Sequence, residues 1–328
     1  MSAYLLTHSE TLTLCTLLHL PVQPGSVLSA WLRQQEFPES IDLSGESLES
    51  LAGKGYYAPQ DKNQPIQPEL VKSLVLFAVN AAEIIAILRR NGQAALTRFA
   101  QMGNSVVQYG IENECLCVHA ATVQAVLVDK IIPGWFTVSQ NEGLKAELPL
   151  GAFLLFKRAC ELADLTTAET NFASAQFAKR KLLEQSRLTD GGINLFNVAE
   201  VSRGSVPDQM SLQDQYRLLV SQGFLMENPA PADTIEIAPA GKALAGTLSD
   251  PDLCSLIVSL QIWDDDLPKT GAFLHGDGRL FFLDASQKPG IFLIRQLANR
   301  HEGCSWVQDL LAEGSSARYA DYVITPLK

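Results

Sequence analysis

The stretch Leu51-Ala-Gly-Lys-Gly55-Tyr56-Tyr57 decides the fold, because a similar stretch, Leu219-Val-Ser-Gln-Gly223-Phe224-Leu225, follows 168 residues later. In both stretches an apolar-periodic segment ends at a glycine, which can adopt the left-handed conformation that closes a helix. Aromatic or apolar residues then follow the glycine. The match predicts that the chain contains one structural unit twice.

Other landmarks recur in the same order around these two stretches. Pro38 and Pro207 lie upstream at nearly the same offset. Downstream, Lys72-Ser-Leu74 matches Lys242-Ala-Leu244 at an offset of 170 residues. Each unit therefore has a helix, a polar hairpin-like loop and a further helix, which is the order of a winged helix.

Apolar runs after the second helix of each unit predict an antiparallel meander. His275-Gly-Asp-Gly278 indicates a tight turn between two of its strands. The expected strands are 83–88, 106–111, 116–120 and 123–131 in the first unit, and 253–262, 272–275, 280–284 and 291–297 in the second.

The sequence thus predicts an α/β protein of the α+β type with two similar halves. Each half combines a winged-helix-like helical subdomain with an antiparallel β-meander, and a pseudo-two-fold axis relates the halves. We expect the first repeat over residues 1–165 and the second over residues 166–328, packed closely because no low-complexity linker separates them. Residues 153–165 and 168–188 are expected to form helices at this boundary.

Length and charge limit the possible functions. The chain has 328 residues, 47% of them hydrophobic, and a formal net charge of −11. This composition is typical of a folded protein of about two domains. An acidic chain is a poor candidate for binding nucleic acid or anionic membranes. The two helices that could enter a DNA groove, Ser44–Lys54 and Leu212–Gln222, have no excess of Arg and Lys, so we expect no nucleic-acid binding.

The chain start lacks the features of an export signal. Met1 to Leu20 contains no Lys or Arg, and Thr7-x-x-Glu10 reads as a capping box at a helix start. The most apolar stretch, Leu74–Leu88, is interrupted by polar residues and is too short to span a bilayer. The six cysteines are sparse and form no disulfide framework. These patterns predict a cytoplasmic protein that does not insert into a membrane.

One segment has the residue types of a metal site. Cys115, Cys117 and His119 alternate, so on a strand they share one face and could begin a zinc site. Leu116 and Val118 point to the other face, and no fourth ligand lies at a standard spacing. A buried structural strand is the favoured interpretation, and we expect no bound metal.

Two charged clusters are also interpreted as structural. Trp263-Asp-Asp-Asp266 could offer carboxylates to a cation, but a solvated strand end explains it better. Lys179-Arg-Lys181 favours a solvated helix face over a small partner contact. The chain contains no nucleophile elbow, P-loop, zinc helix or C-x-x-C pair. We therefore expect no catalytic residues, no cofactor and no enzymatic activity.

The order of elements resembles the EspG family, the cytosolic chaperones of type VII secretion systems. Two segments carry this resemblance, Ser50-Leu-Ala-Gly-Lys-Gly-Tyr56 and Gln67-Pro-Glu-Leu-Val-Lys-Ser-Leu74. Trp135-Phe-Thr-Val138 followed by Leu148-Pro-Leu150 is similar to the middle of the family's chain. The resemblance implies two similar α/β halves and a non-enzymatic carrier of an aggregation-prone export partner. It transfers no particular binding residue.

Trp135 and Phe136 are the candidate protein-binding residues. They follow the turn signal Pro133-Gly134, and exposed aromatics of this kind are common interface anchors. They could equally fill the seam between the halves. Together with the eliminations above, these residues favour a cytosolic chaperone or adaptor for a secreted protein partner. A winged-helix transcriptional regulator and an unrecognised enzyme remain the alternatives.

Overall fold

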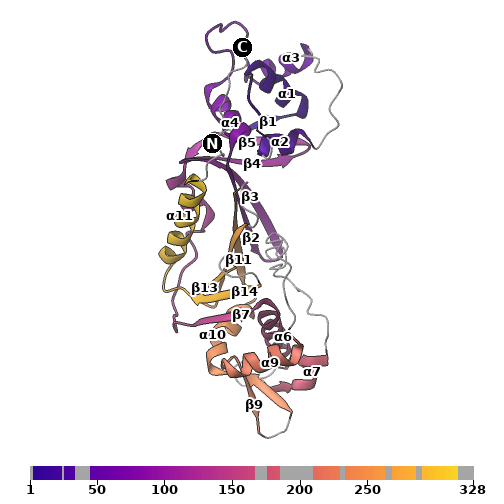
Figure 1. Cartoon of the computed structure of the whole chain (residues 1–328), viewed down its shortest axis with the longest axis vertical. Helices are drawn as coiled ribbons and strands as arrows, with labels where there is room; N and C mark the ends of the chain where they lie inside the picture. Colours follow the sequence, from indigo (N-terminus) through magenta and orange to yellow (C-terminus); the bar gives the residue numbers. More distant parts are fainter. Residues whose placement is uncertain are drawn as a thin grey trace.

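The protein is described by a computed structural model over residues 3–23, 26–33, 45–166, 176–184, 210–229, 233–262, 268–285 and 290–316. The described part is an α+β structure of helices and antiparallel sheet, as the sequence predicts. It is elongated, with a helical lobe at each end and a long sheet between the lobes (Figure 1). The lobe that contains the first described residues is called the N-terminal lobe, and the lobe at the opposite end is called the distal lobe.

A single large antiparallel sheet runs through both lobes. Across the described residues its strand order is β1-β5-β4-β3-β2-β11-β12-β13-β14-β7, and β6 pairs with β4. These strands are β1 (Ala3–Leu6), β2 (Ala82–Arg90), β3 (Gln93–Met102), β4 (Ser105–Glu112), β5 (Cys115–His119), β6 (Thr122–Val123), β7 (Lys145–Pro149), β11 (Cys254–Ile262), β12 (Lys269–Gly276), β13 (Arg279–Asp284) and β14 (Ile291–Gln296). A small second sheet has the order β8-β10-β9, from β8 (Gln176–Ala178), β9 (Leu225–Asn228) and β10 (Thr234–Ile237).

The helices cover different parts of the sheet. The N-terminal lobe contains α1 (His8–Leu17), α2 (Val27–Leu32), α3 (Gly45–Gly53) and α4 (Pro68–Val79). The distal lobe contains α6 (Leu150–Thr166), α7 (Lys179–Glu184), α9 (Leu212–Ser221) and α10 (Pro239–Leu248). A short 3-10 turn (Gln124–Val126), α5 (Val128–Ile131) and α11 (Arg300–Ser316) pack against the middle of the sheet, on the face opposite the lobes.

β2 and β11 join the two ends of the molecule. They pair antiparallel along their whole length, from Cys254 opposite Arg90 to Ile262 opposite Ala82. Buried apolar residues of both strands share one core with α11 and with Phe136. Backbone pairing and a common core therefore bind the lobes into one body.

The same order of elements occurs twice along the chain. In each half a helix is followed by a glycine with φ of +72°, Gly55 or Gly223, and then by a helix that begins at a proline and by strands of the large sheet, β2–β6 or β11–β14. Only the second half has two strands, β9 and β10, between the glycine and the proline-initiated helix. Leu51 and Leu219 are fully buried in the first of these helices, α3 and α9. The prediction of two similar halves requires Leu51 and Leu219 to lie in corresponding helices, as they do. The pseudo-two-fold axis stays a prediction.

The boundary near residue 165 also stays a prediction, but the contacts favour an earlier one. β7 pairs with β14, and α6 packs with residues of α9 and α10, although both elements precede residue 165. A boundary between Ile132 and Leu144 would place β7 and α6 in the same half as β14, α9 and α10, which they contact.

Several local predictions are confirmed and three are corrected. The capping box of Thr7 and Glu10 is present at the start of α1, and Asp277 and Gly278 form the predicted turn with positive φ. Residues 123–131, predicted as a strand, form mainly helical turns, because their apolar side chains face the core at helical spacing. Residues 176–178 are a strand rather than part of a helix over 168–188, because they pair with β10. β3 was not predicted at all. Pro38 and Pro207 lie outside the described residues.

Candidate functional site

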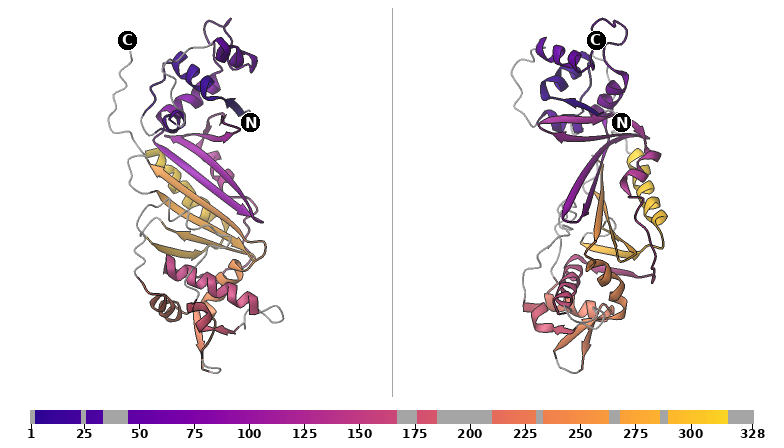
Figure 2. Two further views of the ribbon diagram at one scale, coloured as in Figure 1. Left: turned by 90° about the vertical axis from the view of Figure 1, so that its right-hand side faces the viewer. Right: turned by 180° about the vertical axis from the view of Figure 1, so that it is seen from behind.

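Among the described residues, no helix covers one face of the sheet between the two lobes. α11 and α5 cover the other face, as Figure 2 (left) shows with the open face toward the viewer. The open part is formed by the side chains of β2, β3 and β4 that point away from α11. At the start of β3 the four residues Gln93–Leu96 are all exposed. This region is called the open sheet face.

An apolar row crosses the sheet on this face. The strand registers place each residue opposite the next one from Ile294 to Leu96, and place Ile111 opposite Leu116. Leu96 and Ile111 belong to the paired strands β3 and β4 but lie beyond the directly paired residues Arg98 and Tyr109. The row consists of Ile294, Leu283, Ala272, Ile257, Ile87, Leu96, Ile111 and Leu116.

The middle of the apolar row is in contact with water. Ile294, Leu283, Ala272 and Ile257 are buried under the distal lobe, and Leu116 is buried under the N-terminal lobe. Between them Leu96 is 55% exposed and Ile111 is 51% exposed. A solvated sheet face is normally polar, so this exposed apolar stretch is a candidate contact surface.

A buried polar cluster lies beside the row. The Tyr109 hydroxyl donates a short hydrogen bond to the Glu83 carboxylate, and the Tyr109 ring packs edge-on against Phe77. Burial raises the pKa of Glu83, against the opposing effects of this hydrogen bond and of Arg98. Burial also raises the pKa of Tyr109. The cluster ties β2 to β4 and borders the open sheet face with polar groups.

Only one of the two predicted aromatics presents a surface. Trp135 is 40% exposed, and its ring lies 4.7 Å below the Arg90 guanidinium. Phe136 is 1% exposed, stacked on His275 at 5.0 Å, and lies in the core that both halves share. Of the two interpretations of Phe136, an exposed interface anchor or a residue that fills the seam, its burial favours the second.

Trp135 borders a surface cavity of about 480 Å³ together with Arg90, His275, Asp250 and Asp252. Three acidic side chains line this cavity, since Asp277 is also part of its wall. The His275 Nε2 atom lies 2.9 Å from the Thr137 carbonyl oxygen. The Trp135 ring therefore lies at the edge of a cavity whose wall contains three aspartates.

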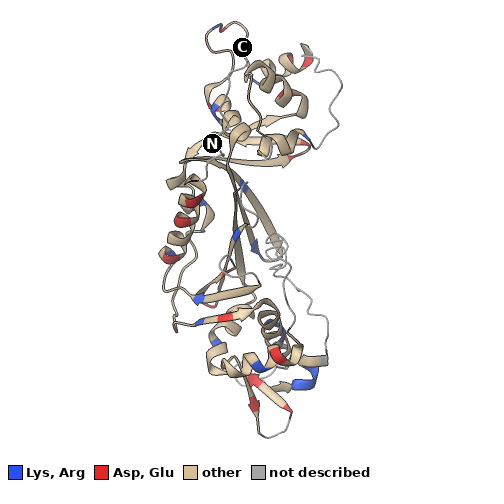
Figure 3. Ribbon diagram, viewed as in Figure 1, with Lys and Arg blue, Asp and Glu red and all other residues tan. Residues whose placement is uncertain are grey.

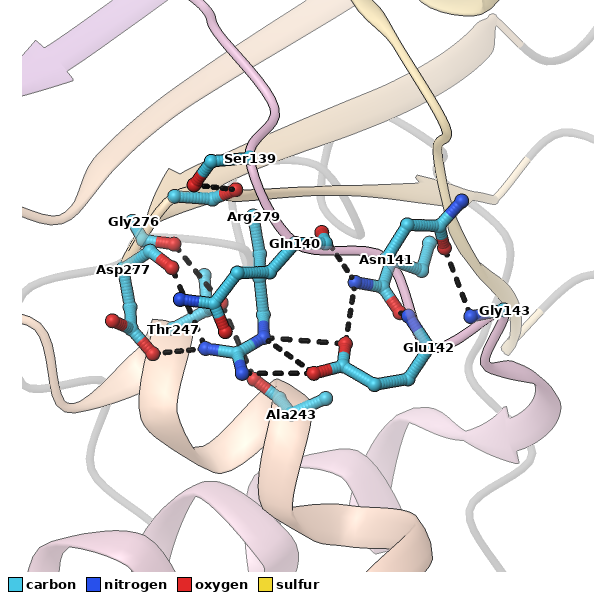
Figure 4. A network of polar contacts seen from close by, with 12 residues as sticks. Ser139, Gln140, Asn141, Glu142, Gly143, Ala243, Thr247, Gly276, Asp277 and Arg279 are labelled. Carbon is cyan, nitrogen blue, oxygen red and sulfur yellow. Dashed lines mark hydrogen bonds and ion pairs between the residues drawn. The ribbon is translucent and has the colours of Figure 1, made fainter.

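The segment that follows Trp135 is anchored by a polar network (Figure 4). Arg279 on β13 donates to the Glu142 carboxylate at 2.8 Å and also pairs with Asp277. Gln296 donates to the same carboxylate at 2.8 Å and accepts from the Glu142 amide at 3.0 Å. The hydrogen bonds from Arg279 lower the pKa of Glu142. This network holds the segment 139–143 against the turn at Asp277.

The other predicted candidates behave as structural elements or lie outside the described residues. Cys117 on β5 is buried, whereas Cys115 and His119 at its ends are partly exposed. No group of three metal-binding side chains forms a site within the part of the chain that is described. Lys179 in α7 pairs with Glu227 at 2.6 Å and lies over the Tyr216 ring, and Lys181 is exposed. Trp263–Asp266 lies outside the described residues.

The two helices considered for DNA binding have few basic groups. In α9, Arg217 pairs with Asp214 at 3.4 Å, and α3 begins with the acidic Glu46. Lys and Arg do not gather on either helix (Figure 3). Their surfaces lack the positive charge that phosphate contacts require.

Sequence reasoning missed the apolar row and the open sheet face. Leu96 and Ile111 lie on β3 and β4, and only the pairing of these two strands in the folded chain brings both residues to the same part of the sheet. The turn residues Asn91 and Gly92, which both have positive φ, were an available signal for the hairpin that presents Leu96.

Among the described residues, no helix combines the length and the apolar composition needed to cross a membrane. No family model matches this chain, and neither does any curated protein. A solved structure of the Mycobacterium tuberculosis type VII secretion system chaperone EspG5 in complex with a PE25-PPE41 dimer is similar over 98% of this chain and 99% of that chain. The identity is 14% and the TM-score is 0.48. This likeness is too weak to support a function.

Proposed function

We propose that the chain is a non-enzymatic binding protein, a chaperone or adaptor whose protein partner docks on the open sheet face. The observation that carries this proposal is the exposed middle of the apolar row, where Leu96 on β3 and Ile111 on the neighbouring β4 are each more than half exposed between two covered ends. A partner that offers an apolar segment would complete the cover that the two lobes begin.

The geometry of the open sheet face is that of a protein-binding surface rather than of an ordinary solvent-exposed surface. Exposed apolar side chains are ordinary when they are scattered, but contiguous ones rimmed by polar groups mark interaction sites. Here the partly exposed Arg98 lies on the same face beside the apolar residues, above the largely buried pair of Glu83 and Tyr109. An apolar centre with a polar rim is the usual anatomy of a protein interface.

Trp135 is proposed as a second partner contact, in place of the predicted pair. Its exposed ring is held by Arg90 and by the anchored segment behind it, so it loses little conformational entropy on binding. The proposal keeps the cytoplasmic location, which rests on the chain start, the apolar stretches and the cysteines, and the secreted nature of the partner, which rests on the sequence resemblance.

The proposal is tested by site-specific cross-linking in the native host. A photoreactive phenylalanine analogue replaces Leu96 in one strain and Val123, an equally exposed residue of β6, in the other. We expect one protein to be cross-linked in stoichiometric amount from position 96 and not from position 123.

Charge substitutions check the same surface. Leu96→Asp and Ile111→Asp should abolish co-purification of the cross-linked protein, whereas Val123→Asp should leave it unchanged. Equal co-purification with all three variants would contradict docking on the open sheet face.

A further inference from the structure

One side of β3 is paired along only part of its length. β2 pairs with the whole of β3 on the other side. β4 pairs with β3 only as far as Arg98, which is opposite Tyr109, and then continues along the N-terminal lobe with β5 (Figure 1). Among the described strands, none pairs with Gln93–Thr97 on the side away from β2. This segment is called the free edge of β3.

The hairpin geometry decides which backbone groups of the free edge are unpaired. Arg90 and Gln93 flank the two-residue turn Asn91–Gly92, so their N–H and C=O groups face each other. The direction of these groups alternates along the strand, so those of Ala94 and Leu96 point away from β2. Both residues are exposed, and neither has another hydrogen bond in the part of the chain that is described. Their N–H and C=O groups are therefore open to water.

The two outer strands of the large sheet are protected in a way that β3 is not. On β1 the Leu5 amide donates to the Tyr56 hydroxyl at 3.3 Å, and Lys54 Nζ donates to the Leu5 carbonyl oxygen at 3.0 Å. On β7 the Gln222 side chain donates to the Glu147 carbonyl oxygen at 3.1 Å. Within the described ranges the free edge of β3 has no such side-chain partner, and it contains neither a charged residue nor a proline. An unprotected edge of this kind is a template for pairing with another strand.

The charges near the free edge identify the kind of strand that fits it. The chain as a whole is acidic, yet Ile84–Ile111 contains no acidic residue and three arginines, Arg89, Arg90 and Arg98. None of the three forms an ion pair within the described ranges. A second copy of the chain would bring the same arginines against these, whereas an acidic segment of another protein would be attracted to them.

We propose that the partner adds an extended segment to the free edge of β3 as a further strand of the sheet. The added strand forms backbone hydrogen bonds with Ala94 and Leu96, and places an apolar side chain beside Leu96 on the open sheet face. Its acidic side chains lie toward the arginines of the hairpin. This inference rests on the proposed function, because it states how the same partner binds.

A proline substitution separates backbone pairing from side-chain contact. Ala94→Pro removes an N–H group that points away from β2, where proline is tolerated in a strand. Ala94→Ser keeps this N–H and is the matched control. With the protein that is cross-linked from position 96 as the probe, we expect Ala94→Pro to weaken binding at least tenfold and Ala94→Ser to leave it unchanged. Equal binding by a folded Ala94→Pro would overturn the added strand.

Amide hydrogen exchange of the unaltered chain is a second measurement that needs no variant. In the free chain the amides of Ala94 and Leu96 should exchange rapidly, and that of Ala95, which is opposite Leu88 and bonded to it, slowly. In the complex the exchange of Ala94 and Leu96 should slow at least tenfold, because the added strand bonds both amides. Unchanged exchange at both residues would refute the proposal.

The outcomes also distinguish this inference from the proposed function. If no protein is cross-linked from position 96, both are rejected. If a protein is cross-linked but leaves the amides of Ala94 and Leu96 unprotected, only the added strand is rejected. Protection that arises in the free chain as its concentration is raised would identify a second copy as the occupant and would also reject the proposal.

Discussion

Gly241 shows at the scale of one residue how tightly the distal lobe is packed. A Cβ atom at this position in α10 would lie 2.7 Å from the Phe224 carbonyl oxygen and 3.0 Å from the Phe156 ring. Backbone atoms cannot move aside without disturbing the elements around them. Glycine is therefore required here by space rather than by helix propensity.

We expect Gly241→Ala to lower the free energy of unfolding by about 1–3 kcal/mol, the usual effect of overpacking a core. Gly53→Ala in α3 is the matched control, because no atom lies within 4 Å of its added Cβ. There the better helix propensity of alanine should stabilise the protein by up to about 1 kcal/mol. Urea denaturation of both variants checks the opposite signs, and two changes of the same sign would contradict this account.

Glu10 is a second residue whose effect can be tested. Its buried carboxylate accepts hydrogen bonds from Lys54 Nζ at 2.8 Å, from Ser50 Oγ at 2.7 Å and from the Thr7 amide at 2.8 Å. Burial alone would raise the pKa of Glu10, but these hydrogen bonds outweigh it and the pKa is lowered. A carboxyl whose pKa is lower in the folded chain stabilises the protein above its unfolded pKa and loses this effect as the pH falls through its folded pKa.

Glu10→Gln should therefore lower the free energy of unfolding by about 1–3 kcal/mol at pH 7. The difference from the parent protein should shrink as the pH falls below about 4.3, the ordinary glutamate value. Urea denaturation at pH 7 and at successively lower pH measures it, with the exposed Glu49→Gln as control. A difference that grows at low pH would have the wrong sign for this mechanism.

At the scale of elements, the segment 139–143 is held by Arg279 of β13 together with Gln296 of β14. Arg279 and Gln296 hold Glu142, and the Ser139 amide donates to the Gly278 carbonyl at 2.8 Å. Arg279→Gln should cost about 1–2 kcal/mol of stability, because charged hydrogen bonds are lost at a partly exposed site. It should also free residues 139–143 for proteolysis.

Limited proteolysis with mass spectrometry identifies the cleavage sites. New cleavage within 139–143 in Arg279→Gln, but not in Arg217→Gln, is the expected result. Equal resistance of both variants would mean that the segment is held by other contacts.

The elements also show what could be predicted from the sequence. The capping box, the glycine-terminated helices and the turn at Asp277 and Gly278 were predictable, since each depends on residues close together in the chain. β3 was missed because Ala94-Ala-Leu-Thr-Arg98 has weak strand propensity and is held in the sheet by two neighbouring strands. Residues 123–131 were misassigned because a short apolar run fits a strand and a buried helix equally well.

The candidate site was less predictable than the fold. Trp135 could be identified from its turn context, but the burial of Phe136 depends on His275 from the other half of the chain. The apolar row depends on the register of eight strands, and a shift of one residue in any of them would break it. Information of this kind is distributed over the whole sheet and is absent from any local segment.

At the scale of the whole molecule, the continuous sheet predicts cooperative unfolding. The N-terminal lobe has Trp31 in its core, and Trp306 lies against the shared core. Variants that keep only one of these tryptophans should give coincident urea transitions, because β2 and β11 connect the lobes along their entire length. Midpoints that differ between the two probes would show that the N-terminal lobe unfolds separately from the middle of the sheet.

The pairing of β2 with β11 also has a consequence in time. The partner of each β2 residue is synthesised about 170 residues later, so the ribosome requires roughly 10–35 s to produce it. During that interval the nascent first half presents an unpaired strand edge that includes Ile84, Ala86 and Leu88. Such an edge is a template for association with other chains. The long-range pairing that joins the lobes of the folded molecule therefore leaves the nascent chain prone to aggregation until β11 has been synthesised.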